Sequence, residues 1–335
     1  MPRYHKPIFA TLCIAALLLF VADIFFGSIA IPVSEVWAAL IGKSSDATLR
    51  SIILDIRLIK AIVAIIAGVS LSVSGLQMQT MFRNPLAGPY VLGVSAGASF
   101  GVALFTLGVP LLGISLSPWM ASLGSAGAAW AGAACVMIII VILARRMRDV
   151  MVILILGMML SSALSAVVEI LQYLSNEAAL KTYVVWTMGS LGDVTLGQLA
   201  MIIPIFAVGV LLSIVSIKGL NAILLGETSA MTVGINVARL RRRLYISTTL
   251  LAGTVTAFCG PIGFVGLAAP HIARMVFRSA DHRILLPASA LVGCIMLLAA
   301  DLITTTVHLP VNTITALMGI PVVAYIVIHR PNQMQ

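Results

Sequence analysis

Long apolar segments follow one another along almost the whole chain, with short polar breaks between them. A membrane-spanning helix needs about 20 consecutive apolar residues, and about ten segments meet that requirement. They lie near residues 8–27, 58–81, 92–112, 118–144, 150–173, 194–217, 241–259, 263–279, 284–304 and 311–329. The pattern therefore predicts an all-α, polytopic membrane protein with about ten transmembrane helices.

Two of these segments contain matching stretches. Residues 67–75 read AGVSLSVSG and residues 252–260 read AGTVTAFCG, and a Gly/Pro-rich break follows each stretch. The match is short and rich in small residues, so chance similarity is the alternative to duplication. An odd number of spans per repeat places the second copy upside down in the membrane. The ten spans thus divide into two inverted five-helix repeats, about 1–175 and about 190–330.

Composition and charge support the membrane class. The chain is 61% hydrophobic and 9% charged, whereas soluble domains carry about 25% charged residues. With the N-terminus in the cytoplasm, 15 of the 20 Lys and Arg residues fall in inner loops and 5 on the outer side, which is the positive-inside pattern. The net charge of +9 therefore reflects topology rather than nucleic-acid binding. Both termini are expected in the cytoplasm.

The first span has two features of a cleaved signal peptide. Arg3 and Lys6 precede it, and residues 28–30 resemble a cleavage site. Its length and the charge pattern favour a retained span. The four cysteines lie inside apolar spans without CxxC spacing, which predicts neither a disulfide framework nor a metal site.

The inner segment 218–243 is too long to be a simple turn. It contains two short helix-like pieces separated by Gly226, with Gly234 ahead of four arginines. A cytoplasmic helix pair has no membrane in which to bury its apolar residues, which are Leu224, Leu225, Met231 and Val233. The segment therefore either docks on a partner protein or packs against the inner surface of its own chain.

Acidic residues inside membrane spans can mark ion-coupled transporters. Asp23, Glu169 and Asp301 are the candidates, and each lies near the outer end of its span. This position favours interfacial or helix-packing roles, and ion-coupled secondary transport is the alternative function. The histidines lack metal-ligand spacing, and no nucleophile–base arrangement is evident, so neither a metal site nor an enzyme active site is predicted.

Two further patterns have limited weight. IGKS at 41–44 resembles the end of a phosphate-binding loop, but Trp37 stands where the loop requires its first glycine. No nucleotide site is therefore predicted in this chain. Arg57 and Lys60 begin the second span at the outer face. They are either interfacial anchors or a cationic patch for an acidic docking partner.

Six segments, in the same order, resemble signature stretches of the permease subunits of FecCD-type ABC importers, which take up iron–siderophores, haem or vitamin B12. They are IRLIK at 56–60, SGLQMQTMFRNPLAGPYVLGVSAGA at 74–98, LLGETSAMTVG at 224–234, GPIGFVGLAAPHIAR at 260–274, DHRILLPASAL at 281–291 and LPVNTITALMGIP at 309–321. The resemblance covers nearly the whole chain. It implies one permease domain over 1–335, in the bacterial inner membrane, that moves an iron chelate inward by alternating access.

The resemblance also implies partners. It predicts a homodimer with a pathway along the two-fold axis, two ATPase subunits that bind ATP and Mg, and a periplasmic or lipid-anchored substrate-binding protein. This chain is expected to bind no cofactor and to catalyse no reaction. Its coupling loop, 218–240, is expected to dock into the ATPase through Leu225, Gly226, Glu227, Ser229, Ala230 and Gly234. Residues 228–230 read TSA where Glu-Ala-Ala is common in the family.

On the outer face, the resemblance assigns Arg57 and Lys60 to docking of the binding protein. A further basic residue is common in the family where this chain has Thr305. The outer docking charge is therefore expected either to be weaker or to be supplied by Arg50 or Lys181.

The translocation pathway is expected to follow the second span and the stretch 93–101. The candidate lining residues are Gln77, Gln79, Gly93, Ser95, Gly97 and Ser99. An inner gate is expected near 145–149, by analogy with the family. The sequence does not distinguish a siderophore from haem or cobalamin as cargo.

Overall fold

The computed structural model describes residues 5–43, 46–111, 113, 118–144, 147 and 150–329. These residues form helices joined by loops, and none of them is in a strand. Six described helices are long and apolar enough to cross a membrane: His5–Phe25, Val94–Leu111, Leu123–Ala144, Met151–Leu174, Leu196–Val215 and His282–Val307. The prediction of an all-α, multi-pass membrane protein is confirmed.

Each expected span coincides with a helix, and three of the helices join a π-helical segment without a break. These helices are α1 (His5–Phe25), α4 (Leu58–Phe82, preceded by η1, Ile52–Arg57), α5 (Val94–Ala103, continued by η2, Leu104–Gly108, and α6, Val109–Leu111), α7 (Pro118–Ala144), α8 (Val150–Leu174), α10 (Leu196–Val215), α13 (Val237–Thr248, continued by η3, Thr249–Gly253, and α14, Thr254–Cys259), α15 (Val265–Phe277), α16 (His282–Val307) and α17 (Val311–His329). Shorter helices connect them: α2 (Val33–Leu40), α3 (Ala47–Ser51), α9 (Glu177–Thr187), α11 (Ile217–Leu224) and α12 (Glu227–Thr232).

The two matching stretches lie on helices that run in opposite directions. α4 ends beside α11, where the Arg83 guanidinium donates a hydrogen bond to the Ile223 carbonyl at 3.2 Å. α13 begins at the same end, because its Arg241 forms an ion pair with Glu227 of α12. The helix contacts of the two repeats also correspond. Within the first repeat α5 packs on α7, and within the second α15 packs on α16. Between the repeats, α4 packs on α16, and its counterparts η3 and α14 pack on α7. This arrangement agrees with two inverted repeats.

α4 is largely enclosed, with 20 of its 25 residues buried, and small residues let its neighbours approach it closely. A Cβ atom at Gly75 would lie 1.8 Å from the carbonyl oxygen of Gly266 on α15. Small residues of this kind are the usual means of close helix contact in membranes, where lipid and protein interior are equally apolar. Gly75 therefore fixes the separation between α4 and α15.

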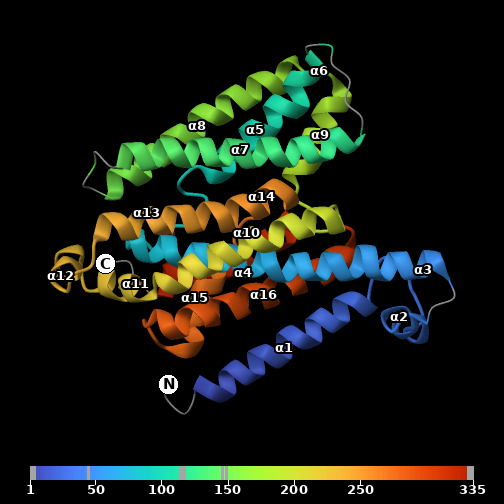
Figure 1. Cartoon of the computed structure of the whole chain (residues 1–335), viewed down its shortest axis with the longest axis horizontal. Helices are drawn as coiled ribbons and strands as arrows, with labels where there is room; N and C mark the ends of the chain where they lie inside the picture. The colour runs from blue at the N-terminus through green and yellow to red at the C-terminus, as the bar shows by residue number, and fades with distance from the viewer. Residues whose placement is uncertain are drawn as a thin grey trace.

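Figure 1 shows how the helices are arranged. α5, α7, α8 and α9 lie together along one side of the bundle, α1 lies along the opposite side, and α4, α10 and α13 to α16 lie between them. α2 and α3 mark one end, which we call the α2 end, and α11 and α12 mark the other, which we call the α12 end.

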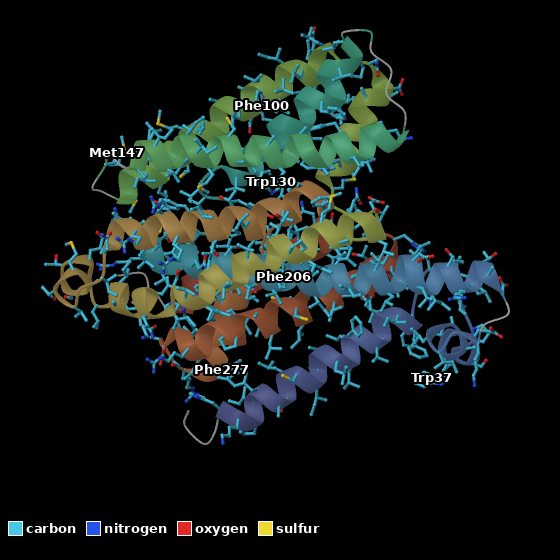
Figure 2. The ribbon with its side chains drawn as sticks, in the orientation of Figure 1. Trp37, Phe100, Trp130, Met147, Phe206 and Phe277 are labelled. Atoms are coloured by element: carbon cyan, nitrogen blue, oxygen red, sulfur yellow. The ribbon has the colours of Figure 1, made fainter. Side chains whose placement is uncertain are left out.

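The start of α1 is held at the α12 end by ring contacts of His5 and Phe9 with Phe277. The rings of Phe9 and Phe277, the latter labelled in Figure 2, have centroids 4.5 Å apart. The His5 Nε2 atom also lies 3.1 Å from the Phe277 carbonyl oxygen. Because Phe277 ends α15, these contacts fasten α1 to the second repeat.

Candidate functional site: a helix–glycine–helix unit and the opposite end

The predicted coupling loop forms two short helices at a sharp bend. α11 ends at Leu224, and Gly226 then adopts φ 111° and ψ 150° before α12 begins at Glu227. This backbone region is strained for residues that carry a Cβ atom. Glycine at 226 therefore sets the angle between α11 and α12.

The predicted contact residues of this loop differ in exposure. Leu225 is 76% exposed, and Val233 is 74% exposed. Ser229 and Gly234 are also exposed, whereas Gly226 and Glu227 are half-buried. Ala230 is 1% exposed and packs in the chain's own core. Six of the nine positions named for the loop's surface and docking contacts are thus exposed, and Ala230 anchors the loop.

Four apolar side chains of the loop are exposed, and we call them together the coupling surface: Leu224, Leu225, Met231 and Val233. Exposed apolar side chains gathered at the polar end of a membrane bundle are typical of a protein-binding site. Of the two interpretations from the sequence, the exposed surface favours docking on a partner.

Asn221 on α11 ties the loop to two long helices. Its amide oxygen accepts a hydrogen bond from the backbone N–H of His282 at 2.8 Å, and its amide nitrogen donates to the Asp281 carboxylate at 2.6 Å. The same oxygen lies 2.8 Å from His282 Nδ1, and His282 Nε2 lies 2.8 Å from the Thr80 hydroxyl of α4. An Nδ1–H tautomer satisfies the contact with Asn221, because an amide oxygen only accepts hydrogen bonds.

Asp281 has a second role in this chain of contacts. Its carboxylate accepts a hydrogen bond from the backbone N–H of Arg283 at 2.9 Å and so caps the start of α16. That hydrogen bond lowers the pKa of Asp281, and its contact with Asn221 lowers it further. The carboxylate is therefore ionised where it holds Asn221.

At the α2 end, Arg57 is buried, and its guanidinium is hydrogen-bonded within the chain. Its side chain is 4% exposed and donates hydrogen bonds to the carbonyl oxygens of Ile24, Phe25 and Ile29, the first at 3.2 Å and the second at 3.1 Å. These carbonyls lie at the end of α1 and just beyond it, where a helix leaves acceptors unpaired. Arg57 thus binds α1 to α4.

Lys60 is also directed into the protein. Its Nζ atom lies 2.8 Å from the Asp301 carboxylate and 3.8 Å from Asp23, and it donates a hydrogen bond to the Thr305 hydroxyl at 2.8 Å. Two of the three acids named as candidates for ion coupling, Asp23 and Asp301, therefore share a basic partner. Thr305, where the family commonly has a basic residue, provides an acceptor for Lys60.

The surface of the α2 end carries other cations. Arg50 and Lys181, named as replacements for the missing docking charge, are both exposed. A docking role for Arg57 and Lys60 stays a prediction, and in the structure neither side chain is free to meet a partner.

The candidate pathway residues Gln77 and Gln79 lie inside the bundle. Gln77 is 0% exposed, and its amide nitrogen donates to the hydroxyls of Ser213 and Ser247. Gln79 is 3% exposed; it accepts a hydrogen bond from Arg274 at 2.6 Å and donates one to the Leu267 carbonyl. Both amides therefore join α4 to neighbouring helices.

The Gly/Ser stretch forms the start of α5. Gly93 and Gly97 are buried, and Ser95 and Ser99 are half-buried. A Cβ atom at Gly97 would lie 2.6 Å from the carbonyl oxygen of Gly132 on α7, so this face of α5 packs tightly on α7. The pathway assignment rests on the family resemblance.

The inner gate expected near 145–149 lies outside the described residues, apart from Met147. Five of the basic residues counted as inner also lie outside them: Arg3, Arg145, Arg146, Arg148 and Arg330.

Comparison with known proteins decides the family. The model of the FecCD transport family matches residues 14–329. The chain belongs to this family. The FecCD chain is 32% identical over 312 residues to the hemin transport system permease protein of Yersinia pestis, covering 92% of this chain and 91% of that protein. It is 36% identical over 278 residues to the vitamin B12 import system permease protein of Citrobacter koseri, covering 82% of each.

A solved structure extends the similarity to three dimensions. The FecCD chain matches a metal-chelate type ABC transporter in an inward-facing conformation with a TM-score of 0.82 and 28% sequence identity, over 96% of this chain and 99% of that one. The family resemblance proposed from six sequence segments is confirmed.

Several residues of the FecCD chain that shape this site were not assigned a role from its sequence. Asn221, Asp281 and His282 are the main ones; the DHR triplet at 281–283 was noticed only as part of a family segment. Within the described ranges, no group of three or more His, Cys, Asp or Glu residues is placed to hold a metal ion. The absence of a resident cofactor stays a prediction.

Proposed function

We propose that this FecCD chain is the permease subunit of an ABC importer whose α11–α12 unit receives movement from a separate ATPase subunit. The observation that carries the proposal is the coupling surface. It exposes apolar side chains at the end of a membrane bundle, on a bend set by Gly226. Such a surface fits a groove on a soluble partner.

The contacts behind this surface provide two routes for movement. From α12, the ion pair between Glu227 and Arg241 leads to α13 in the second repeat. From α11, Arg83 and the Asn221–His282–Thr80 contacts lead to α4 and α16. A displacement of α11–α12 therefore acts on helices of both inverted repeats, as alternating access requires.

The complete importer that we propose contains two copies of this chain, two ATPase subunits that bind ATP and Mg, and a substrate-binding protein. The permease domain spans 1–335, with the coupling loop at 218–240. It lies in the bacterial inner membrane with the α12 end and both termini in the cytoplasm. Exposed Arg50 and Lys181 provide positive charge for the binding protein at the α2 end.

The proposed cargo is a metal chelate: a ferric siderophore, haem or cobalamin. The named relatives transport hemin and vitamin B12, and the similar structure belongs to a metal-chelate transporter. The chain itself catalyses no reaction in this proposal. ATP hydrolysis takes place in the partner.

Hydrolysis and uptake in lipid discs and vesicles test the proposal. The permease and its ATPase, with and without binding protein, are compared with Gly226→Arg and Gly42→Arg. Gly42 is a matched control because its φ is +74° and it lies at the α2 end. We expect ATP-dependent uptake that Gly226→Arg abolishes and Gly42→Arg preserves. Uptake that follows an ion gradient without any ATPase would instead support secondary transport.

A further inference from the structure

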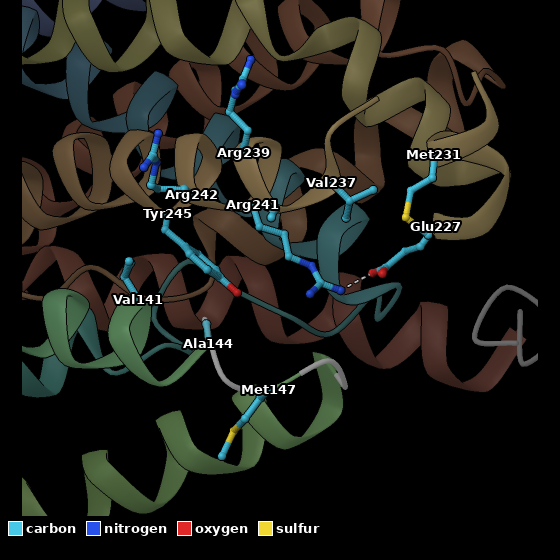
Figure 3. A pocket seen from close by; sticks show the side chains of 11 residues that line it. Val141, Ala144, Met147, Glu227, Met231, Val237, Arg239, Arg241, Arg242 and Tyr245 are labelled. Carbon is cyan, nitrogen blue, oxygen red and sulfur yellow. Dashed lines mark hydrogen bonds and ion pairs between the residues drawn. The ribbon is translucent and has the colours of Figure 1, made fainter. Parts of the chain in front are cut away.

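The Glu227–Arg241 ion pair lies in the wall of a cavity at the α12 end, and the function proposed above does not use the space inside it. Its volume is about 810 Å³, and it lies between the end of α7, α12 and the first turns of α13 (Figure 3). The apolar part of its wall comes mainly from Val141, Ala144 and Met147 on one side and from Met231 and Val237 on the other.

Two hydrogen-bond donors in this cavity have no acceptor among the described residues. Tyr245 is 2% exposed, and its hydroxyl is buried without a hydrogen-bond partner. The Nε atom of Arg241 is buried and likewise unpaired, although the other end of its guanidinium binds Glu227. Figure 3 shows the Tyr245 hydroxyl and the Arg241 guanidinium turned toward the same space.

Unpaired buried donors are costly, and native proteins rarely retain them without a ligand or water. A phenol O–H and a guanidinium N–H both need an oxygen acceptor. An anionic oxygen is the best acceptor for a guanidinium, because hydrogen bonds between charged groups are the stronger ones. The two donors therefore define the chemistry of a ligand that carries a phosphate or a similar anion.

The charge around the cavity points the same way. Its wall includes three arginines, Arg239, Arg241 and Arg242, against one acid, Glu227. Arg239 and Arg242 extend away from the Tyr245 hydroxyl (Figure 3), so they raise the local positive potential rather than contact the same atoms. With Glu227 already paired, the cavity has a surplus of positive charge.

The location of the cavity identifies the source of the anion. It lies at the end of the span α7 and the start of the span α13, and most of its wall is apolar. Basic pockets between transmembrane helices are suited to acidic phospholipids. We propose that this cavity binds the headgroup of an acidic phospholipid, whose phosphate accepts hydrogen bonds from the Tyr245 hydroxyl and Arg241 Nε.

The site adjoins the coupling unit. A phosphate bound there shares the Arg241 guanidinium with Glu227, the residue that begins α12. If α12 couples to an ATPase as proposed above, the lipid adjusts that coupling. Lipid binding itself depends only on the cavity, so it is measured on the permease alone.

Native mass spectrometry of the detergent-purified permease tests this proposal. The full chain is titrated with dioleoyl phosphatidylglycerol, with dioleoyl phosphatidylcholine, and with inorganic phosphate. We expect phosphatidylglycerol to bind about tenfold more tightly than phosphatidylcholine, and Tyr245→Phe, which removes only the hydroxyl, to reduce that affinity about tenfold. Arg241→Gln should reduce it further. Arg283→Gln removes an exposed cation of the same end outside the cavity and should have no effect.

Equal binding of the two lipids would overturn the proposal. So would wild-type affinity for phosphatidylglycerol in both Tyr245→Phe and Arg241→Gln. If inorganic phosphate binds as tightly as phosphatidylglycerol, the ligand is a free anion and the lipid assignment is wrong. Should Arg241→Gln fail to fold, Tyr245→Phe decides alone, because it leaves the ion pair with Glu227 in place.

Discussion

The two ends of the bundle differ in which side chains are exposed and which have partners within the chain. At the α12 end, Leu225 and Val233 are exposed to solvent, and the charge of Glu227 is paired with Arg241. At the α2 end, Arg57 is buried, Lys60 is half-buried, and both make their contacts within the chain. Residue type alone therefore does not identify a candidate docking site in this protein. The side chain must also be exposed and without a partner inside the chain.

The cause of this difference is the cost of burying charge. A buried cation is tolerated only when its partners neutralise it or accept its hydrogen bonds. Arg57 and Lys60 meet this condition by binding carbonyls of the α1 end and carboxylates on α1 and α16. The result is a fixed joint between three helices. At the α12 end, no part of the chain that the structure describes covers the exposed apolar side chains, and we propose that the ATPase subunit does so.

Removing the charge of Lys60 should have the largest effect on the free energy of unfolding. Lys60→Met leaves Asp23 and Asp301 buried without their ammonium, and breaking such a buried pair costs about 3–5 kcal/mol. The measurement is thermal unfolding of the purified permease in detergent. Arg50→Gln, at an exposed cation of the same end, is the control and should change stability by less than about 0.5 kcal/mol. Equal melting temperatures for the two variants would remove the distinction between buried and exposed cations.

Removing the hydrogen bonds of Asn221 should have an intermediate effect on the free energy of unfolding. Asn221→Ala leaves the His282 ring and backbone N–H without their acceptor, at a cost of about 1–3 kcal/mol. We also expect fewer chelate molecules imported per ATP hydrolysed, because α11 then moves without α4 and α16. Uptake and hydrolysis measured together in vesicles give this ratio. An unchanged ratio in Asn221→Ala would show that the contacts only stabilise the fold.

The smallest effect is expected from the cap of α16. Asp281→Ala removes the acceptor for the Arg283 N–H and should cost about 1 kcal/mol near neutral pH. The folded-state pKa of Asp281 is lowered, so its contribution is present above the unfolded pKa and is lost as the pH falls through the folded value. Unfolding measured across acidic pH should therefore show wild type and variant converging. A constant difference at all pH values would contradict this role.

The sequence predicted the helices well because their signal is strong and local. Apolar runs of membrane length identify spans such as α1 and α16, and the positions of Gly226 and Gly234 locate the helix–glycine–helix unit. The antiparallel directions of α4 and α13 follow from the count of spans between them. None of these inferences needs knowledge of long-range contacts.

The contacts of the charged residues could not be predicted in the same way. Lys60 and Asp301 are 241 residues apart, as their numbers show, and nothing in the local pattern of either residue specifies the other. The same holds for Thr80 and His282. The burial of Ala230 also could not be predicted from the neighbouring residues, because it depends on which face of a six-residue helix packs against the bundle. Long-range pairing decided each of these cases.

The most direct test of the central claim compares one substitution at each end. Val233, on the coupling surface, is 74% exposed, and Val33, on α2, is 67% exposed. Affinity of the purified permease for its ATPase subunit is measured for Val233→Glu and Val33→Glu. We expect Val233→Glu to weaken binding by about 30-fold or more, and Val33→Glu to bind like wild type. Equal affinity for both variants, or a loss confined to Val33→Glu, would contradict docking at the α12 end.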